Sequence, residues 1–141
     1  MFVTLYCGIF DIQTGHIDFC NAGHNPPVLI RPGKAPEYLP AGENLPLGVM
    51  EDYPYQKGTL LLAPQDILFL YTDGVTEAMD RESVPFSDER LLESLGRTEG
   101  MAVDKILGKI LADVHLFVKG ALPSDDITML ALQYTSHSNT R

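Results

Sequence analysis

An apolar run that leads into an acidic residue and a glycine constrains this chain more than any other feature. Residues 67–70, Ile-Leu-Phe-Leu, have the composition of a strand buried on both faces, and Asp73 and Gly74 follow almost at once. A carboxylate at the end of a buried strand is held rigidly, and a glycine beside it lets an ion or a phosphate come close. The sequence therefore predicts a site for a charged ligand at this strand end.

A second acidic strand terminus lies far along the chain. Asp125 and Asp126 directly precede residues 127–134, which are predicted to form a strand. Carboxylate oxygens are the ligands that Mg²⁺ and Mn²⁺ prefer, so Asp73 and Asp125 would converge on a divalent cation if the two strands are neighbours. Two alternatives remain open. Asp73-Gly74 can form a hairpin turn, and Asp125-Asp126 can form a solvated turn or a cap.

Length and charge exclude several classes of function. The chain has 141 residues, of which 45% are hydrophobic and 21% charged, as expected for one globular domain. Its formal net charge of −9 argues against nucleic acid and anionic membrane surfaces as partners, because both require clustered Lys and Arg. The sequence shows neither an apolar segment of membrane-spanning length nor a secretory signal, so we expect a cytoplasmic protein.

The two cysteines, Cys7 and Cys20, fall opposite each other if the chain turns at residues 12–15 and Asp11 pairs with His16. They are either a redox pair or two small apolar residues that meet on one face of a hairpin. The second interpretation is favoured, because thiols in the cytosol stay reduced.

Apolar patterning predicts strands in the first half of the chain and helices in the second. Ser87 is the expected N-cap of the first helix, and helical spacing runs from Val103 to Val118, with Gly120 as the stop. The predicted strands cover residues 2–10, 17–21, 28–30, 58–63, 67–71 and 127–134. We expect the fourth and fifth of these to form a hairpin, and residues 41–55 to form an ordered loop. This order indicates an α+β domain in which helices cover antiparallel sheet.

Two further polar residues are candidates for the site. His24 stands in a Gly- and Pro-rich break, where it is a ligand, an acid catalyst or, as is more common for a histidine in a turn, a structural residue. Glu77 follows Asp73 by four residues and is either an acceptor behind the ligand or a capping or exposed residue. The sequence contains no Gly-rich phosphate loop, serine nucleophile elbow or zinc signature.

Five motifs occur in an order that is typical of one family. They are Phe2-Val3-Thr4-Leu5, Asn21-Ala22-Gly23-His24-Asn25-Pro26-Pro27, Leu45-Pro46-Leu47-Gly48, Tyr71-Thr72-Asp73-Gly74-Val75-Thr76-Glu77-Ala78 and Asp125-Asp126-Ile127-Thr128. Together they closely resemble the SpoIIE-like branch of the PPM (phosphatase 2C) superfamily, which are bacterial metal-dependent Ser/Thr protein phosphatases. The resemblance implies an α-β-β-α sandwich of antiparallel sheets with two Mn²⁺ or Mg²⁺ ions between the sheets.

The resemblance also assigns residues and partners. It implies Asp73 and Asp125 as metal ligands, with Asp126 as the fallback, and Gly74, Glu77 and His24 as candidates for the surrounding positions. It implies hydrolysis of phosphoserine or phosphothreonine on a regulatory partner protein, commonly an antagonist of an anti-sigma factor, with a sensor or receiver domain before the phosphatase domain. The alternative is a non-catalytic interaction module on a degenerate phosphatase fold, which would bind a partner through residues 41–55 and the second helix.

One motif of the family is absent from the sequence. The family carries Asp-Val-x-Gly-His/Lys-Gly, whose aspartate bridges both metals, and no acid of this chain has that context. We therefore expect residues 1–134 to be a partial phosphatase domain without its first strands, inactive on its own, and 135–141 to be a polar tail. Exposed sheet edges would favour a homodimer. His24 stands where more distant members have an acid that helps hold a further metal, which argues against a third metal site.

Overall fold

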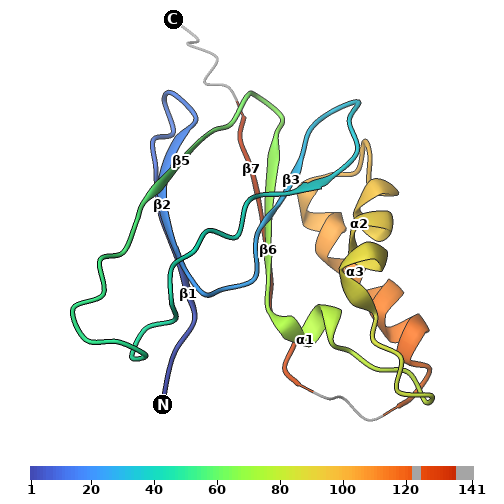
Figure 1. Cartoon of the computed structure of the whole chain (residues 1–141). Helices are drawn as coiled ribbons and strands as arrows, with labels where there is room; N and C mark the ends of the chain where they lie inside the picture. The colour runs from blue at the N-terminus through green and yellow to red at the C-terminus, as the bar shows by residue number, and fades with distance from the viewer. Residues whose placement is uncertain (122–124, 136–141) are drawn as a thin grey trace, which may run out of the picture.

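The computed structural model describes residues 1–121 and 125–135, whose strands form two antiparallel sheets (Figure 1). The first sheet contains β1 (Leu5–Phe10), β2 (His16–Ala22) and β5 (Gly58–Leu61), in that spatial order. The second contains β4 (Glu37–Tyr38), β3 (Val28–Ile30), β6 (Ile67–Tyr71) and β7 (Met129–Gln133), again in that order.

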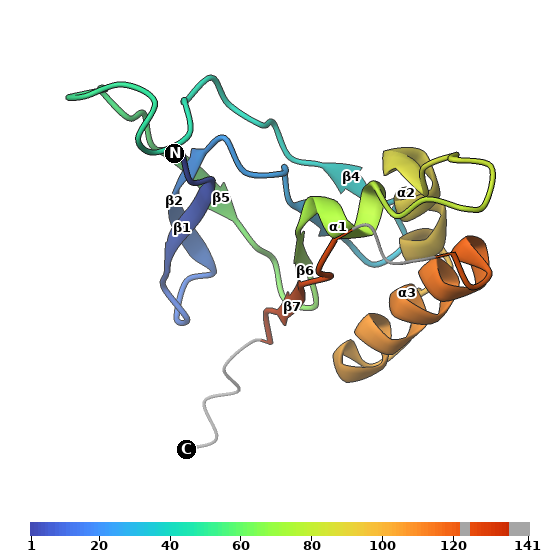
Figure 2. The same ribbon diagram turned by 90° about the horizontal axis from the view of Figure 1, so that it is seen from below.

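The helices lie on one side of the second sheet. α2 (Ser87–Gly96) and α3 (Val103–Val118) pack together against this sheet, and the β1-β2-β5 sheet lies on its opposite side (Figures 1 and 2). A single helical turn, α1 (Asp73–Thr76), follows β6. The predicted α+β class with helix-covered antiparallel sheet is confirmed. In the two described stretches, no helix is both long and apolar enough to cross a bilayer.

Strand β6 separates two apolar cores, as its unbroken apolar sequence predicts. Phe69 and Tyr71, which are 0% and 2% exposed, belong to the core between sheet and helices. Leu68, 4% exposed, belongs to the core between the two sheets, and Leu70 packs against that core. Because successive side chains of a strand point to opposite faces, only a strand covered on both sides buries both sets.

Both long helices follow their sequence patterns. α2 begins at Ser87, and Phe86 takes the N-cap position that was predicted for Ser87, a shift of one residue. The Ser87 Oγ still accepts the Arg90 N–H at 3.5 Å. α3 has the predicted bounds and buries three residues one turn apart, Ile106, Ile110 and Val114. It ends where Lys119 adopts a left-handed φ of 46°, followed by Gly120 at 77°.

The first hairpin has the predicted register. The Asp11 N–H donates to the His16 carbonyl at 2.8 Å, and Cys7 lies opposite Cys20. Both cysteines are free. Because directly opposite residues of two paired strands point to the same face, Cys7 and Cys20 meet on one face of the hairpin, as the preferred interpretation predicts.

One predicted strand pairing is wrong. β5 and β6 do not form a hairpin, because β5 pairs with β2 in the first sheet whereas β6 pairs with β3 and β7 in the second. The chain crosses between the sheets at residues 62–66. The crossing is fixed by Asp66, 2% exposed, whose Oδ2 accepts the Ala63 N–H at 2.9 Å and the Arg31 Nε–H at 3.3 Å. This buried acceptor turns the chain toward Arg31, so the short connection does not close a hairpin.

The remaining boundaries differ from the predicted ones by a few residues. The strand predicted for residues 2–10 starts at Leu5, and Val3 forms only an isolated bridge to Leu47 in the loop 41–55. That loop has no helix or strand but is ordered. The Asn44 Nδ2–H donates to the Gln56 carbonyl at 2.7 Å, and the Gln56 N–H donates back to Asn44 Oδ1 at 2.8 Å. Residues 136–141 of the predicted tail lie outside the described residues.

Candidate metal-ion site

The two acidic segments lie side by side at one edge of the second sheet. β6 and β7 pair antiparallel with Tyr71 opposite Met129, so the end of β6 and the start of β7 fall together. The Thr72 N–H donates to the Thr128 carbonyl at 3.0 Å, and the Thr128 N–H donates to Thr72 Oγ1 at 3.1 Å. The predicted adjacency of the two strand ends is confirmed.

Gly74 contributes to this contact in a way that the sequence did not reveal. A Cβ built on Gly74 would lie 2.1 Å from the backbone oxygen of Asp126 and 2.8 Å from its carbonyl carbon. The residue is buried. The missing side chain therefore admits the backbone of Asp126, whereas the sequence analysis assigned that space to an ion or a phosphate.

Asp73 is the first residue of α1 and is exposed to solvent. Its backbone carbonyl accepts the Glu77 N–H at 2.8 Å, which closes the helical turn. Asp73-Gly74 thus opens a short helix, and the hairpin-turn alternative is wrong. Glu77 follows this turn and is also exposed.

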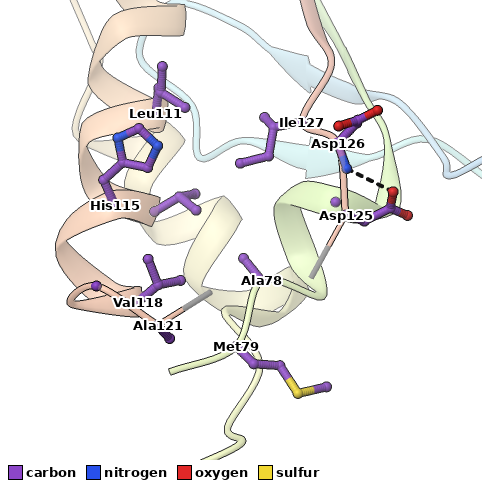
Figure 3. A pocket seen from close by; sticks show the side chains of 12 residues that line it. Ala78, Met79, Leu111, His115, Val118, Ala121, Asp125, Asp126 and Ile127 are labelled. Carbon is purple, nitrogen blue, oxygen red and sulfur yellow. Dashed lines mark hydrogen bonds between the residues drawn. The ribbon is translucent and has the colours of Figure 1, made fainter. Parts of the chain in front are cut away.

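Asp125 and Asp126 precede β7 and are both exposed. The Asp126 N–H donates to Asp125 Oδ1 at 2.7 Å, a contact between adjacent residues. An Asx-type cap would instead reach the N–H two residues further on, so this bond does not confirm the capping alternative. Figure 3 shows both carboxylates on the far side of an apolar pocket, pointing away from Leu111 and His115 of α3. This pocket, of about 570 Å³, lies between α1, α3 and the start of β7.

The described residues provide only part of a metal-binding set. In residues 1–121 and 125–135, no group of three or more His, Cys, Asp or Glu side chains is placed to hold a metal ion. The donors present nevertheless have the right chemistry, because exposed carboxylates suit a hard cation that keeps several of its waters. Asp73, Asp125 and Asp126 offer this type of oxygen, and their role as ligands stays a prediction.

His24 lies in the connection between β2 of the first sheet and β3 of the second, and it borders the same strand ends. It lines a cavity of about 240 Å³ together with Thr72 and Thr128, the two residues that join the acidic segments. The sequence analysis did not single out either threonine. The sequence did mark these two residues, because each threonine lies between a strand and its acidic motif.

Structural comparison places this fold among the PP2C-type phosphatase domains. The phosphatase domain of SpoIIE from Bacillus subtilis matches with a TM-score of 0.74 and 18% identity, over 98% of this chain and 59% of that one. The RsbU and RsbW domains of Rv1364c from Mycobacterium tuberculosis match with a TM-score of 0.73 and 25% identity, over 94% and 36%. The predicted α-β-β-α sandwich class is confirmed, and the chain covers the C-terminal part of that domain.

The sequence identifies the family. Residues 1–135 match the family described as Stage II sporulation protein E (SpoIIE), and the chain belongs to that family. Protein IcfG of Synechocystis sp. (strain ATCC 27184 / PCC 6803 / Kazusa) is 33% identical over 94% of this chain, and the phosphoserine phosphatase RsbP of Bacillus subtilis (strain 168) is 33% identical over 60%. The chain spans 20% of IcfG and 24% of RsbP, well under two thirds of these curated relatives.

Proposed function

We propose that this chain is part of a phosphatase that removes phosphate from phosphoserine or phosphothreonine on a regulatory partner protein, with Mn²⁺ or Mg²⁺ as cofactor. The observation that carries the proposal is the contact between the two acidic strand ends through Thr72 and Thr128. Membership of the SpoIIE family and relatives named as phosphoserine phosphatases support it.

Asp73 and Asp125 are the proposed metal ligands, with Asp126 as the fallback. A bound divalent cation would supply positive charge to the phosphate oxygens and lower the pKa of a coordinated water. This positive charge is needed because the protein has a formal net charge of −9 and its substrate is also an anion. The two threonines and Gly74 hold the acidic segments in register, and Glu77 is proposed to support Asp73 from the end of α1.

The 141 residues alone are proposed to have little or no activity. The family's bridging aspartate has no counterpart in this sequence, and the described carboxylates form an incomplete ligand set. The rest of the reaction centre would come from a part of the domain that this chain does not contain.

The biological setting is also proposed. The partner would be an antagonist of an anti-sigma factor, dephosphorylated in the cytoplasm under the control of an N-terminal sensor or receiver domain. Leu5 and Ile9 of β1 are 44% and 77% exposed, so the isolated chain is expected to self-associate through this strand. Light scattering that shows only a monomer would contradict the last proposal.

Hydrolysis of a phosphoserine peptide by the full-length gene product tests the proposed activity. We expect turnover that requires Mn²⁺ or Mg²⁺ and that falls at least about 100-fold in Asp73→Asn, because the electrostatic stabilisation of the reacting phosphate depends on the held cation. Asp104→Asn, an exposed acid in the first turn of α3, is the matched control and should keep wild-type activity. Metal-independent turnover, or equal loss in both variants, would contradict the proposal. Absence of turnover in the wild type would favour the interaction module.

A further inference from the structure

The apolar pocket beside the acidic segments has no role in the proposed metal site. Asp125 and Asp126 line it, but Figure 3 shows that their carboxylates point away from it. Gly74 lines it as well, so the pocket also borders the start of α1. The pocket and the proposed metal site therefore lie on opposite sides of one short segment of chain.

The lining of this pocket suits an apolar group. Val114 and Ala78, which are 1% and 6% exposed, belong to its buried part, whereas Met79 is 42% exposed. Figure 3 shows Leu111 of α3 on one wall and Ile127 on the facing wall. The volume of about 570 Å³ lies within the about 300–1,000 Å³ that is usual for ligand pockets. Burial of an apolar side chain here would remove apolar surface of both partners from water.

Two positively charged side chains lie at the end of α3 beside the pocket. Nη2 of Arg81 is 3.7 Å from where a Cβ on Gly120 would be, and Gly120 lines the pocket. Lys119 directly precedes Gly120 and is exposed. Within residues 1–121 and 125–135, neither Arg81 nor Lys119 forms an ion pair. Both charges are therefore available to an anionic partner.

This arrangement contrasts with the rest of an acidic protein. The formal net charge is −9, and several cations elsewhere are neutralised by carboxylates, namely Arg31, Lys57, Lys105 and Lys109. Asp80, the acid directly before Arg81, is engaged in its own turn, where Oδ1 accepts the N–H groups of Glu82 and Val84 at 2.9 Å each. An apolar pocket edged by two unpaired cations is complementary to an apolar side chain on an anionic segment.

We propose that this pocket is a specificity subsite, which takes an apolar side chain of the phosphorylated partner protein a few residues from its phosphoserine. The inference rests on the proposed phosphatase function. A phosphoserine carries a charge of about −1.5 to −2 near pH 7, so the segment around it is attracted by Arg81 and Lys119. An extended chain advances about 3.3–3.6 Å per residue, so a few residues are enough to pass from one side of the acidic segment to the other.

The test uses phosphoserine peptides in which a single leucine is moved stepwise along an alanine background, with the full-length gene product and Mn²⁺. One leucine position is expected to raise kcat/KM at least about 10-fold over alanine, mainly through KM, as an apolar pocket discriminates between side chains of different size. In Ala121→Phe the added ring would occupy the pocket, so this preference should disappear. Turnover of an aryl phosphate, which has no peptide, should be the same in Ala121→Phe and the wild type.

A charge reversal tests the two cations. Arg81→Glu is expected to raise KM for the preferred peptide by about threefold or more at low ionic strength, with a smaller effect at high salt, because salt screens exposed charges. Lys105→Glu makes the same change of charge in the first turn of α3, far along the helix from Gly120, and is the matched control. It should leave KM for the peptide unchanged.

Three results would overturn the inference. Equal kcat/KM for all leucine positions, with normal aryl phosphate turnover, would remove the subsite and leave the phosphatase function in place. An altered oligomeric state of Ala121→Phe in light scattering, with the leucine preference kept, would make the pocket an interface between copies of the chain. Absence of turnover of both substrates in the wild type would remove the proposed function and this inference with it. If Ala121→Phe does not fold, the leucine series on the wild type and Arg81→Glu still decide.

Discussion

Replacing Gly74 with alanine is expected to lower the free energy of unfolding by about 2–4 kcal/mol, above the usual 1–3 kcal/mol of an overpacked core site. The added methyl group would lie 2.1 Å from the backbone oxygen of Asp126. Backbone cannot rotate away as a flexible side chain can, so residues 126–128 or α1 must move. Either movement breaks the hydrogen bonds between Thr72 and Thr128, which are the direct link between the acidic segments.

Chemical denaturation measures this effect, and α3 offers a matched control. Gly108→Ala introduces the same methyl group where nothing lies within 4 Å of the new Cβ. Because alanine favours a helix interior over glycine by about 1 kcal/mol, Gly108→Ala should stabilise the protein slightly. If Gly74→Ala is as stable as the wild type, the close packing of α1 on Asp126 is not a feature of the folded protein.

Replacing Asp66 with alanine is expected to destabilise the protein by about 1.5–3 kcal/mol, the range for losing hydrogen bonds to a charged group. The Asp66 side chain is 3% exposed and accepts from Ala63 and Arg31, whose guanidinium would be left with Glu37 alone. The backbone of Asp66 also accepts the Tyr134 N–H at 2.9 Å, so the change lies where both sheets and the end of β7 meet.

A second substitution separates charge from hydrogen bonding at this position. Asp66→Asn keeps an oxygen that can accept the Ala63 N–H and loses only the charge facing Arg31, so it should cost less than Asp66→Ala. Asp104→Ala, an exposed acid, should change stability by less than about 0.5 kcal/mol. Equal stability of Asp66→Ala and Asp104→Ala in denaturant titrations would show that Asp66 does not hold the crossing between the sheets.

The features that the sequence predicted are those that depend on local periodicity. The continuous apolar character of β6 predicted burial on both faces, and the spacing of Ile106, Ile110 and Val114 predicted α3. The turn before His16 fixed the register of the first hairpin. The adjacency of the two acidic strand ends was also predicted, because both strands have a carboxylate at one end and both carboxylates suit the same divalent cation.

The features that the sequence did not predict depend on contacts between distant residues. The crossing from β5 to β6 is set by Asp66 and Arg31, which are 35 residues apart. The role of Gly74 depends on a backbone atom of Asp126, and no pattern near Gly74 indicates it. Likewise, only the packing of the two sheets places His24 in one cavity with Thr72 and Thr128.

Calorimetric titration of the full-length gene product with Mn²⁺ tests the central claim most directly, namely that Asp73 and Asp125 act together on one divalent cation. Loss of a residue that only supports a metal ligand typically weakens metal binding about 10–100-fold. We expect Asp73→Asn and Asp125→Asn each to weaken Mn²⁺ binding by more than this. The double variant should be little worse than either single variant, because both carboxylates serve one ion. Wild-type affinity in both single variants, with Asp104→Asn as the control, would contradict the claim.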